Sequence, residues 1–229
     1  MIRVTENFRK IQDLLTQAAL QAGRLQDSVR LLAVTKGQPA AAVLEAVSVG
    51  QKAFGENFVQ EAVEKIAEVG RDDLSWHFIG HLQSNKTRQV AEQFQWVHTV
   101  DRVKIAERLS RQRPYYADDL NVCIQVMIDP EEDKSGVTPD SLPELAAAIV
   151  ALPKLKLRGL MCIPAVRKGF EAQREPFRRL RRLAEDLASA GIDTGTLSMG
   201  MSADYVAAIH EGATLVRIGT ALFGPRRRN

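Results

Sequence analysis

One lysine stands where a buried strand is expected to end, and its position suggests covalent chemistry. Residues 31–34 are Leu-Leu-Ala-Val, and Lys36 follows two positions later. Four consecutive apolar residues predict a buried strand, and alternate residues of a strand share one face, so Leu32, Val34 and Lys36 point the same way. A partly desolvated lysine can supply a neutral amine, as imine formation with an aldehyde requires. The alternative for this residue alone is a lysine that reaches solvent from a strand end.

Two short segments near the C-terminus predict an anion site. The run Ser198-Met-Gly-Met-Ser202 follows one expected strand, and Gly219-Thr220 follows the next. Gly200 would let the backbone approach a ligand, while Ser202 and the first amides of the helix expected there would face an anion. The alternative for either segment alone is an ordinary turn with a serine cap. Both segments together, opposite a lysine, favour a phosphate site.

Arg217 and Asn57 are two further candidates. Arg217 lies between Val216 and Ile218 on an expected strand. A guanidinium is costly to bury unpaired, so on an inward face it must donate to a partner such as a ring nitrogen or a carboxylate. The alternative is an outward arginine paired with a helix acid. Asn57 either orients a ligand hydroxyl or caps the helix that follows it.

The composition is that of an ordinary globular chain of 229 residues, with 45% hydrophobic and 26% charged residues. This size suits one large domain, and a net charge of +3 is too small to imply nucleic acid. We expect no membrane span and no signal peptide, because no apolar run is long enough. Cys123 and Cys162 both lie in apolar runs, which suits buried thiols in a reducing cytoplasm and gives no zinc pattern.

Strand-like and helix-like patterns alternate eight times along the chain. Expected strands lie at 31–36, 52–55, 74–79, 95–100, 120–128, 155–163, 196–199 and 214–218. Expected helices lie at 5–22, 39–50, 59–69, 86–90, 101–109, 139–152, 170–190 and 202–211. Residues 129–137 form an acidic, glycine-containing loop for which we predict mobility.

This alternation with short connections requires parallel strands and crossover helices, and it predicts a single (β/α)₈ TIM barrel over residues 1–229. A doubly wound open sheet is the alternative, although Thr-Lys-Gly-Gln-Pro after the first strand is not a dinucleotide turn. Little chain follows the last strand. We therefore expect the N-terminal helix to cover the gap there, and we expect no C-terminal β-domain.

In such a barrel the strand ends bring the lysine, the arginine and the phosphate site to one mouth, which describes a site for pyridoxal 5'-phosphate. Several motifs support this and resemble the pyridoxal phosphate homeostasis protein family (YggS/PROSC type), nearly end to end and in the family's order. They are LAVTK (32–36), FGENFVQE (54–61), WHFIG (76–80), LQSNK (82–86), KSG (134–136), RGLM (158–161), LSMGMS (197–202) and VRIGTALFG (216–224).

The resemblance implies a fold like the barrel domain of alanine racemase, and it implies the roles of individual residues. Lys36 would hold the cofactor as a Schiff base, and Arg217 would lie near the pyridine nitrogen. Asn57 falls in the family's asparagine motif. The residues that would surround the phosphate are Ser198, Ser202, Gly219 and Thr220. Gln38 and His81 depart from the family pattern, which often has lysine and proline there, so a secondary role in cofactor transfer at position 38 is not expected.

The expected activity is that of a carrier or buffer for intracellular pyridoxal phosphate, with little or no catalysis. A racemase needs two opposed proton-transfer groups. The alanine racemases take the second, a tyrosine, from a C-terminal domain for which no residues follow Asn229. The alternatives are a pyridoxal phosphate-dependent amino-acid racemase and an imine-forming aldolase. The arginines at 178–182 and 226–228 predict a solvated helix face and a terminus rather than a nucleic-acid site. We expect a monomer, with apo pyridoxal phosphate enzymes as candidate recipients.

Overall fold

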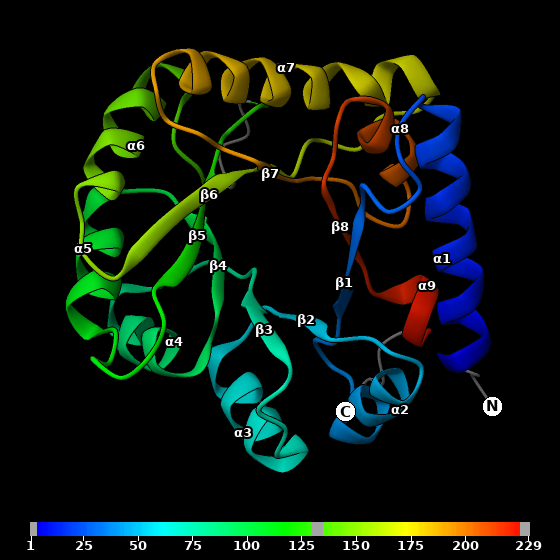
Figure 1. The fold of residues 1–229 in the computed structure, drawn as a ribbon, viewed down its shortest axis with the longest axis horizontal. Coiled ribbons are helices and arrows are strands. Elements are labelled where there is room, and N and C mark those ends of the chain that lie inside the picture. Colours follow the sequence, from blue (N-terminus) through cyan, green and yellow to red (C-terminus); the bar gives the residue numbers. More distant parts are fainter. Residues whose placement is uncertain (1–3, 130–134, 225–229) are drawn as a thin grey trace.

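Eight parallel strands form a closed barrel in a computed structural model that describes residues 4–129 and 135–224 (Figure 1). The strands follow one another in chain order around the barrel, and the eighth pairs with the first. Helices lie around the outside of the strands (Figure 1). The TIM barrel expected from the alternating pattern is therefore confirmed, and the open doubly wound sheet is wrong.

The element bounds agree with the sequence patterns to within a few residues for most elements. The strands are β1 (Arg30–Val34), β2 (Ala53–Glu56), β3 (Ser75–Phe78), β4 (Trp96–Val100), β5 (Leu120–Gln125), β6 (Leu155–Met161), β7 (Thr196–Ser198) and β8 (Leu215–Ile218). The α-helices are α1 (Val4–Gln21), α2 (Ala40–Ser48), α3 (Val59–Val69), α4 (Thr87–Gln93), α5 (Val103–Gln112), α6 (Leu142–Val150), α7 (Phe170–Ser189), α8 (Tyr205–His210) and α9 (Thr220–Phe223). Two 3₁₀ turns, η1 (Ser84–Lys86) and η2 (Pro139–Ser141), precede α4 and α6.

Strand β5 is shorter than its apolar run suggested. The strand ends at Gln125, and beyond it Val126 forms only an isolated bridge to Val137. Val126 and Ile128 are buried in the core. The apolar run through residue 128 therefore reflects burial and not a longer strand. Residues 130–134, which include most of the acidic loop and Lys134 of the KSG motif, lie outside the described residues.

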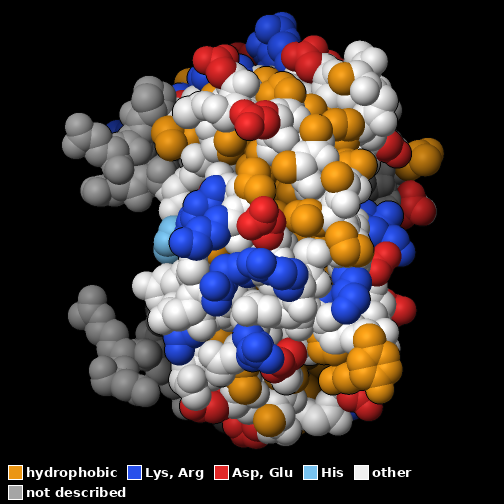
Figure 2. Space-filling model, turned by 90° about the vertical axis from the view of Figure 1, so that its left-hand side faces the viewer, with side chains coloured by type: hydrophobic (Ala, Val, Ile, Leu, Met, Phe, Trp, Pro, Cys, Tyr) orange, Lys and Arg blue, Asp and Glu red, His pale blue; other side chains and the backbone are white. Residues whose placement is uncertain are grey.

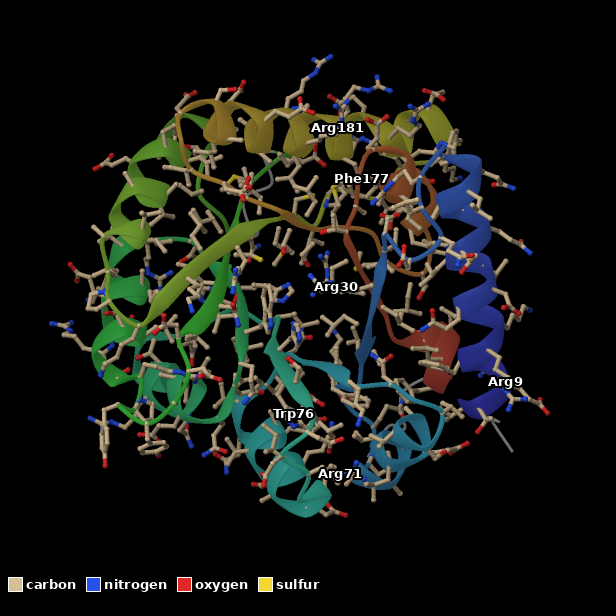
Figure 3. All side chains as sticks on the ribbon, viewed as in Figure 1. Arg9, Arg30, Arg71, Trp76, Phe177 and Arg181 are labelled. Carbon is tan, nitrogen blue, oxygen red and sulfur yellow. The ribbon has the colours of Figure 1, made fainter. Side chains whose placement is uncertain are left out.

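The barrel has an apolar layer between strands and helices and a more polar interior. Outside the strands, side chains such as Phe177 of α7 point toward the sheet and are fully buried (Figure 3). Inside, Leu32, Ile79 and Leu215 form a small separate apolar cluster. The guanidinium of Arg30 lies within the ring of strands, with its central carbon 5.9 Å from the centre of the Trp96 ring (Figure 3).

Helix α1 packs against the part of the barrel wall where β8 meets β1. It contacts α2, α8 and α9, and the side-chain amide of Asn7 donates a hydrogen bond of 2.9 Å to the carbonyl of Leu222 in α9. Its apolar face buries Phe8, Ile11 and Leu15. Helix α9 has only four residues, so α1 covers the gap after the last strand, as the sequence predicted.

The outward faces of the helices are mixed in charge. Figure 2 shows the face with α4, α5 and α6, where Lys and Arg side chains gather among acidic ones, with apolar side chains above them. On α7, Arg178 and Arg181 pair with the buried Glu211 next to α8, so these two arginines hold one helix to its neighbour. No helix in the described part of the chain is long and apolar enough to cross a membrane.

Replacing Leu15 by alanine tests the role of α1. Leu15 is 2% exposed, and its loss leaves a cavity beneath the helix, so the free energy of unfolding should fall by about 2–5 kcal/mol. Leu20 on the same helix is 57% exposed, and Leu20→Ala should change stability by less than about 0.5 kcal/mol. Urea denaturation of both variants measures the difference. Equal stabilities would show that α1 does not seal the barrel.

Candidate functional site

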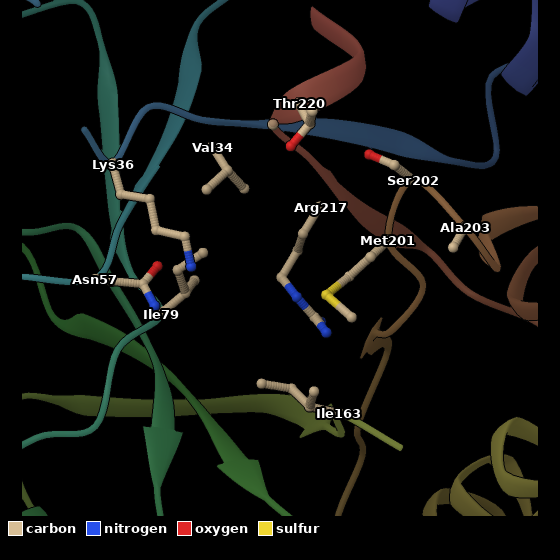
Figure 4. A pocket seen from close by; sticks show the side chains of 11 residues that line it. Val34, Lys36, Asn57, Ile79, Ile163, Met201, Ser202, Ala203, Arg217 and Thr220 are labelled. Atoms are coloured by element: carbon tan, nitrogen blue, oxygen red, sulfur yellow. The ribbon is translucent and has the colours of Figure 1, made fainter. Parts of the chain in front are cut away.

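A cavity of about 300 Å³ opens at the carboxyl ends of the strands (Figure 4). Six of the seven site residues expected from the sequence contribute to its wall. Figure 4 draws Lys36 and Asn57 on one side, Ser202 and Thr220 on another, and Arg217 between them. The full lining consists of Val34, Lys36, Asn57, Ile79, Ile163, Met201, Ser202, Ala203, Arg217, Gly219 and Thr220.

The pairing of β1 with β8 brings the lysine and the arginine to the same cavity. Leu32 is in register with Arg217, so the carboxyl ends of β1 and β8 lie side by side. Residues that follow the two strands therefore reach the same cavity. Gly219 follows β8 and lies close to β1, where a Cβ atom would be 3.2 Å from the Val34 carbonyl oxygen. A larger residue here would push the two strand ends apart.

A buried ion pair lies directly behind the turn that carries Lys36. The Lys65 ammonium of α3 is 2.6 Å from Oε1 of Glu56 on β2, and the two side chains are 5% and 0% exposed. Both hold the residue before Lys36: Lys65 donates to the Thr35 carbonyl, and the Thr35 hydroxyl donates to Glu56, each over 2.6 Å. Burial raises the pKa of Glu56, and the nearby Lys65 charge opposes that rise.

The residue after Lys36 is held by the same helix. The backbone N–H of Gly37 donates to Oε1 of Glu61 over 2.6 Å, and this carboxylate also accepts a hydrogen bond of 2.8 Å from Lys65. Gly37 has φ +70°, a conformation that favours glycine. The backbone on both sides of Lys36 is therefore tied to one charged network on β2 and α3.

Asn57 lines the cavity from the loop between β2 and α3. Its Oδ1 atom is buried and has no hydrogen-bond partner among the described residues. Helix α3 begins at Val59 after Phe58 in the N-cap position, so Asn57 does not cap it. Gly80 allows the loop to lie here, because a Cβ atom at that position would be 1.9 Å from the Asn57 carbonyl oxygen.

The segment after β7 differs from the sequence-based expectation. Helix α8 begins at Tyr205 and not at Ser202, because a turn intervenes in which Asp204 Oδ1 accepts the Met201 N–H over 2.7 Å. Ser202 therefore offers its hydroxyl to the cavity, but the first amides of a helix do not follow it. Gly200 also packs closely against α8, since a Cβ atom there would be 2.7 Å from that of Ala208.

Arg217 points inward and is 5% exposed, as its place on the strand predicted. One terminal nitrogen, NH1, donates to Ser198 twice, to the carbonyl over 2.5 Å and to the hydroxyl over 2.9 Å. The other, NH2, donates to the Cys162 carbonyl over 2.9 Å. Burial lowers the pKa of Arg217 from its ordinary value. Ser198, the seventh expected site residue, is fully buried against this guanidinium, apart from the lining of the cavity.

Two residues at which the sequence departs from the family pattern also lie at the mouth. Gln38 lies beside Lys36, Gly219 and Thr220 in a smaller adjoining hollow of about 30 Å³. His81 lines a neighbouring hollow of about 410 Å³ that Asn57 also borders, and its Nδ1 is 2.7 Å from the Ser135 hydroxyl. Both positions border hollows that share residues with the lining of the candidate cavity.

Comparison with known proteins identifies the family of this chain. The family model for the N-terminal domain of alanine racemase matches residues 4–227. The pyridoxal phosphate homeostasis protein of Pseudomonas aeruginosa is 56% identical, with 99% of this chain and 97% of that protein covered. The Escherichia coli K12 protein of the same name is 49% identical, with 97% of each chain covered. This chain belongs to the pyridoxal phosphate homeostasis protein family.

Solved structures agree with this family assignment. PipY of Synechococcus elongatus PCC7942, with PLP bound, is 38% identical and superposes with a TM-score of 0.85, over 96% of this chain and all of PipY. Alanine racemase of Corynebacterium glutamicum shares the fold, with a TM-score of 0.71 at 15% identity, and this chain spans 61% of its length. The homeostasis family therefore has the barrel of the racemases, as expected.

Replacing Lys65 tests the ion pair behind Lys36. Lys65→Met leaves the Glu56 carboxylate buried without its partner, so the free energy of unfolding should fall by about 3–5 kcal/mol. Changing Glu56 to leucine as well should restore much of this loss. Lys52→Met removes an exposed ion pair with Asp73 and should cost about 0–1 kcal/mol. If denaturation shows equal losses for Lys65→Met and Lys52→Met, the buried pair does not support the turn.

Proposed function

We propose that this protein binds pyridoxal 5'-phosphate through the amine of Lys36 and serves as a carrier or buffer of the cofactor. The observation that supports this most is the meeting of Lys36, Arg217 and two hydroxyl groups around one cavity. These groups match the three functional parts of the cofactor, an aldehyde, a ring nitrogen and a phosphate. The family assignment supports the same proposal.

The cavity suits the cofactor in size and chemistry. Its volume of about 300 Å³ is at the lower end of the range for small-molecule sites, roughly 300–1,000 Å³. Val34, Ile79 and Ile163 supply apolar surface for a planar ring. The buried Oδ1 of Asn57 lacks a partner among the described residues, so it can accept a hydrogen bond from a ligand hydroxyl.

Each side chain has a proposed role that follows from its chemistry. Lys36 would hold the cofactor through a covalent link to its aldehyde carbon, with loss of one water, and Arg217 would donate toward the ring nitrogen. Asn57 orients the ring hydroxyl. The residues proposed to hold the phosphate are Ser202, Gly219 and Thr220. Ser198 has a different role, since it holds the guanidinium of Arg217.

The proposed role as a carrier rests on the groups that face the cavity. Bound pyridoxal phosphate can withdraw electrons from an attached amino acid, and a racemase adds proton transfer on both faces of that adduct. Lys36 and Arg217 are the titratable side chains among the described lining residues. A guanidinium keeps its proton, so Arg217 does not transfer one and does not give a proton to the ring nitrogen. A ring nitrogen without a proton is a weak electron acceptor.

The tyrosines lie apart from the described lining of the cavity: Tyr115 and Tyr116 are 90% and 79% exposed, and Tyr205 is in α8.

The proposal extends to the compartment in which the protein works and to the proteins that receive the cofactor. Cys123 and Cys162 are buried free thiols, which suits a reducing cytoplasm. We propose that the protein acts there as a monomer and delivers the cofactor to apo forms of pyridoxal phosphate enzymes.

The visible absorbance of the purified protein with added pyridoxal phosphate tests the covalent link. Borohydride should fix the chromophore to Lys36, as a mass increase on the peptide that contains it, and Lys36→Ala should lose this label. Lys104→Ala, exposed on α5, is the matched control and should keep it. A protein that stays colourless would end the proposal and favour an aldolase. Amino-acid racemase activity in the same yellow sample would contradict the carrier role.

Thr220→Val tests the proposed phosphate site. The valine side chain has the same shape without the hydroxyl, so affinity for pyridoxal phosphate should fall about tenfold, the value of one hydrogen bond to a charged group. Affinity for pyridoxal, which has no phosphate, should stay within about twofold. Fluorescence titration with both ligands gives the comparison. An equal loss for both would place Thr220 away from the phosphate.

A further inference from the structure

A row of hydrogen-bonding side chains crosses the barrel interior behind Arg217. The Ser198 hydroxyl is 2.8 Å from Nδ1 of His98, and Nε2 of His98 is 2.9 Å from Nδ1 of His77. Nε2 of His77 is 3.0 Å from the hydroxyl of Ser75. The row joins β7, β4 and β3, and His98 and His77 are 0% and 2% exposed. Neither histidine is explained by the proposed cofactor contacts.

The arginine at one end determines the direction of every bond in this row. A guanidinium can only donate, so the Ser198 hydroxyl oxygen accepts from Arg217 and its own proton is free to be donated to His98 Nδ1. The proton of neutral His98 is then on Nε2 and is donated to His77 Nδ1. His77 in turn carries its proton on Nε2 and donates it to Ser75. In the reverse direction the Ser198 proton has no acceptor among the described residues.

The surroundings keep both histidines neutral. Burial lowers the pKa of His77 to about 3, and the charge of Arg30 adds to this effect. Burial also lowers the pKa of His98 well below its usual value, with further contributions from His77, Arg217 and Arg30. A doubly protonated histidine, which would donate from both nitrogens, is therefore excluded at neutral pH.

We propose that His98 and His77 are positioning residues, held in a single tautomer by Arg217, that fix the guanidinium of Arg217 at the cavity. The guanidinium has five N–H groups, and three are used on Ser198 and Cys162. Among the described residues no acceptor contacts Nε or the second proton of NH2, so these two groups can donate to a ligand. The row cannot pass protons to a ligand, because the arginine at its end keeps its own. The contact between Arg217 and a ligand rests on the proposed function. The assignment of the tautomers of His77 and His98 does not depend on it.

Nitrogen NMR of histidine-labelled protein, stripped of cofactor at pH 7, tests the tautomers directly. Both His77 and His98 should show protonated Nε2 and unprotonated Nδ1, with resonances assigned from His77→Gln and His98→Gln. Ser198→Ala removes the donor to His98 and should give a mixture of tautomers. Ser75→Ala removes only the far acceptor and should leave the wild-type pattern. A protonated Nδ1 in the wild-type protein, or scrambling by Ser75→Ala alone, would overturn the proposal.

Cofactor titration of the same protein tests the link to Arg217. His98→Leu should weaken pyridoxal phosphate binding about tenfold. The reason is that the Ser198 hydroxyl, which accepts from Arg217, loses the His98 nitrogen that fixes its orientation. His98→Asn keeps an acceptor for Ser198 and should recover part of this loss, while Ser75→Ala should stay within about twofold. Wild-type affinity in His98→Leu would contradict the positioning role. If the wild-type protein binds no cofactor, the proposed function fails and the NMR result still decides the tautomers.

Discussion

The parallel pairing of β1 with β8 is the interaction on which the site depends. It joins the first strand of the chain to the last, and it sets Leu32 in register with Arg217. Lys36 and Thr220, which line one cavity, come from segments that directly follow these two strands. Helix α1 covers this joint from outside, where α9 is too short to do so. Closure of the barrel, rather than any local motif, therefore sets the geometry of the cavity.

Charged side chains are buried in two places next to the site, one in the barrel interior and one between the barrel wall and helix α3. Burying a charge without a partner is costly, and each buried charge here has several hydrogen bonds. Lys65 has three acceptors, on Thr35, Glu56 and Glu61. Arg217 also has three, two on Ser198 and one on Cys162. Both groups lie behind the cavity. These two clusters hold parts of the site, while other buried charges, such as Glu211 against α7, join elements elsewhere in the barrel.

Much of the site could be predicted because strand ends obey simple rules. A residue such as Lys36 or Arg217 that interrupts an apolar run is visible in the sequence, and period two gives the face on which it lies. The supporting residues could not be found this way. Lys65 fits an amphipathic helix pattern as an ordinary charged residue, and its partner Glu56 belongs to a different element. His98 is likewise an unremarkable strand residue until the closed barrel places Ser198 beside it.

Closure between the first and last strands also has a consequence for biosynthesis. Chains leave the ribosome from the N-terminus, and contacts between residues far apart in sequence form late. Lys36 emerges early, but the segment that completes the cavity with Arg217 and Thr220 is the last part of the barrel to appear. A nascent chain thus presents the lysine without its site. Under the proposed function, the complete ligand site therefore exists only in the finished barrel.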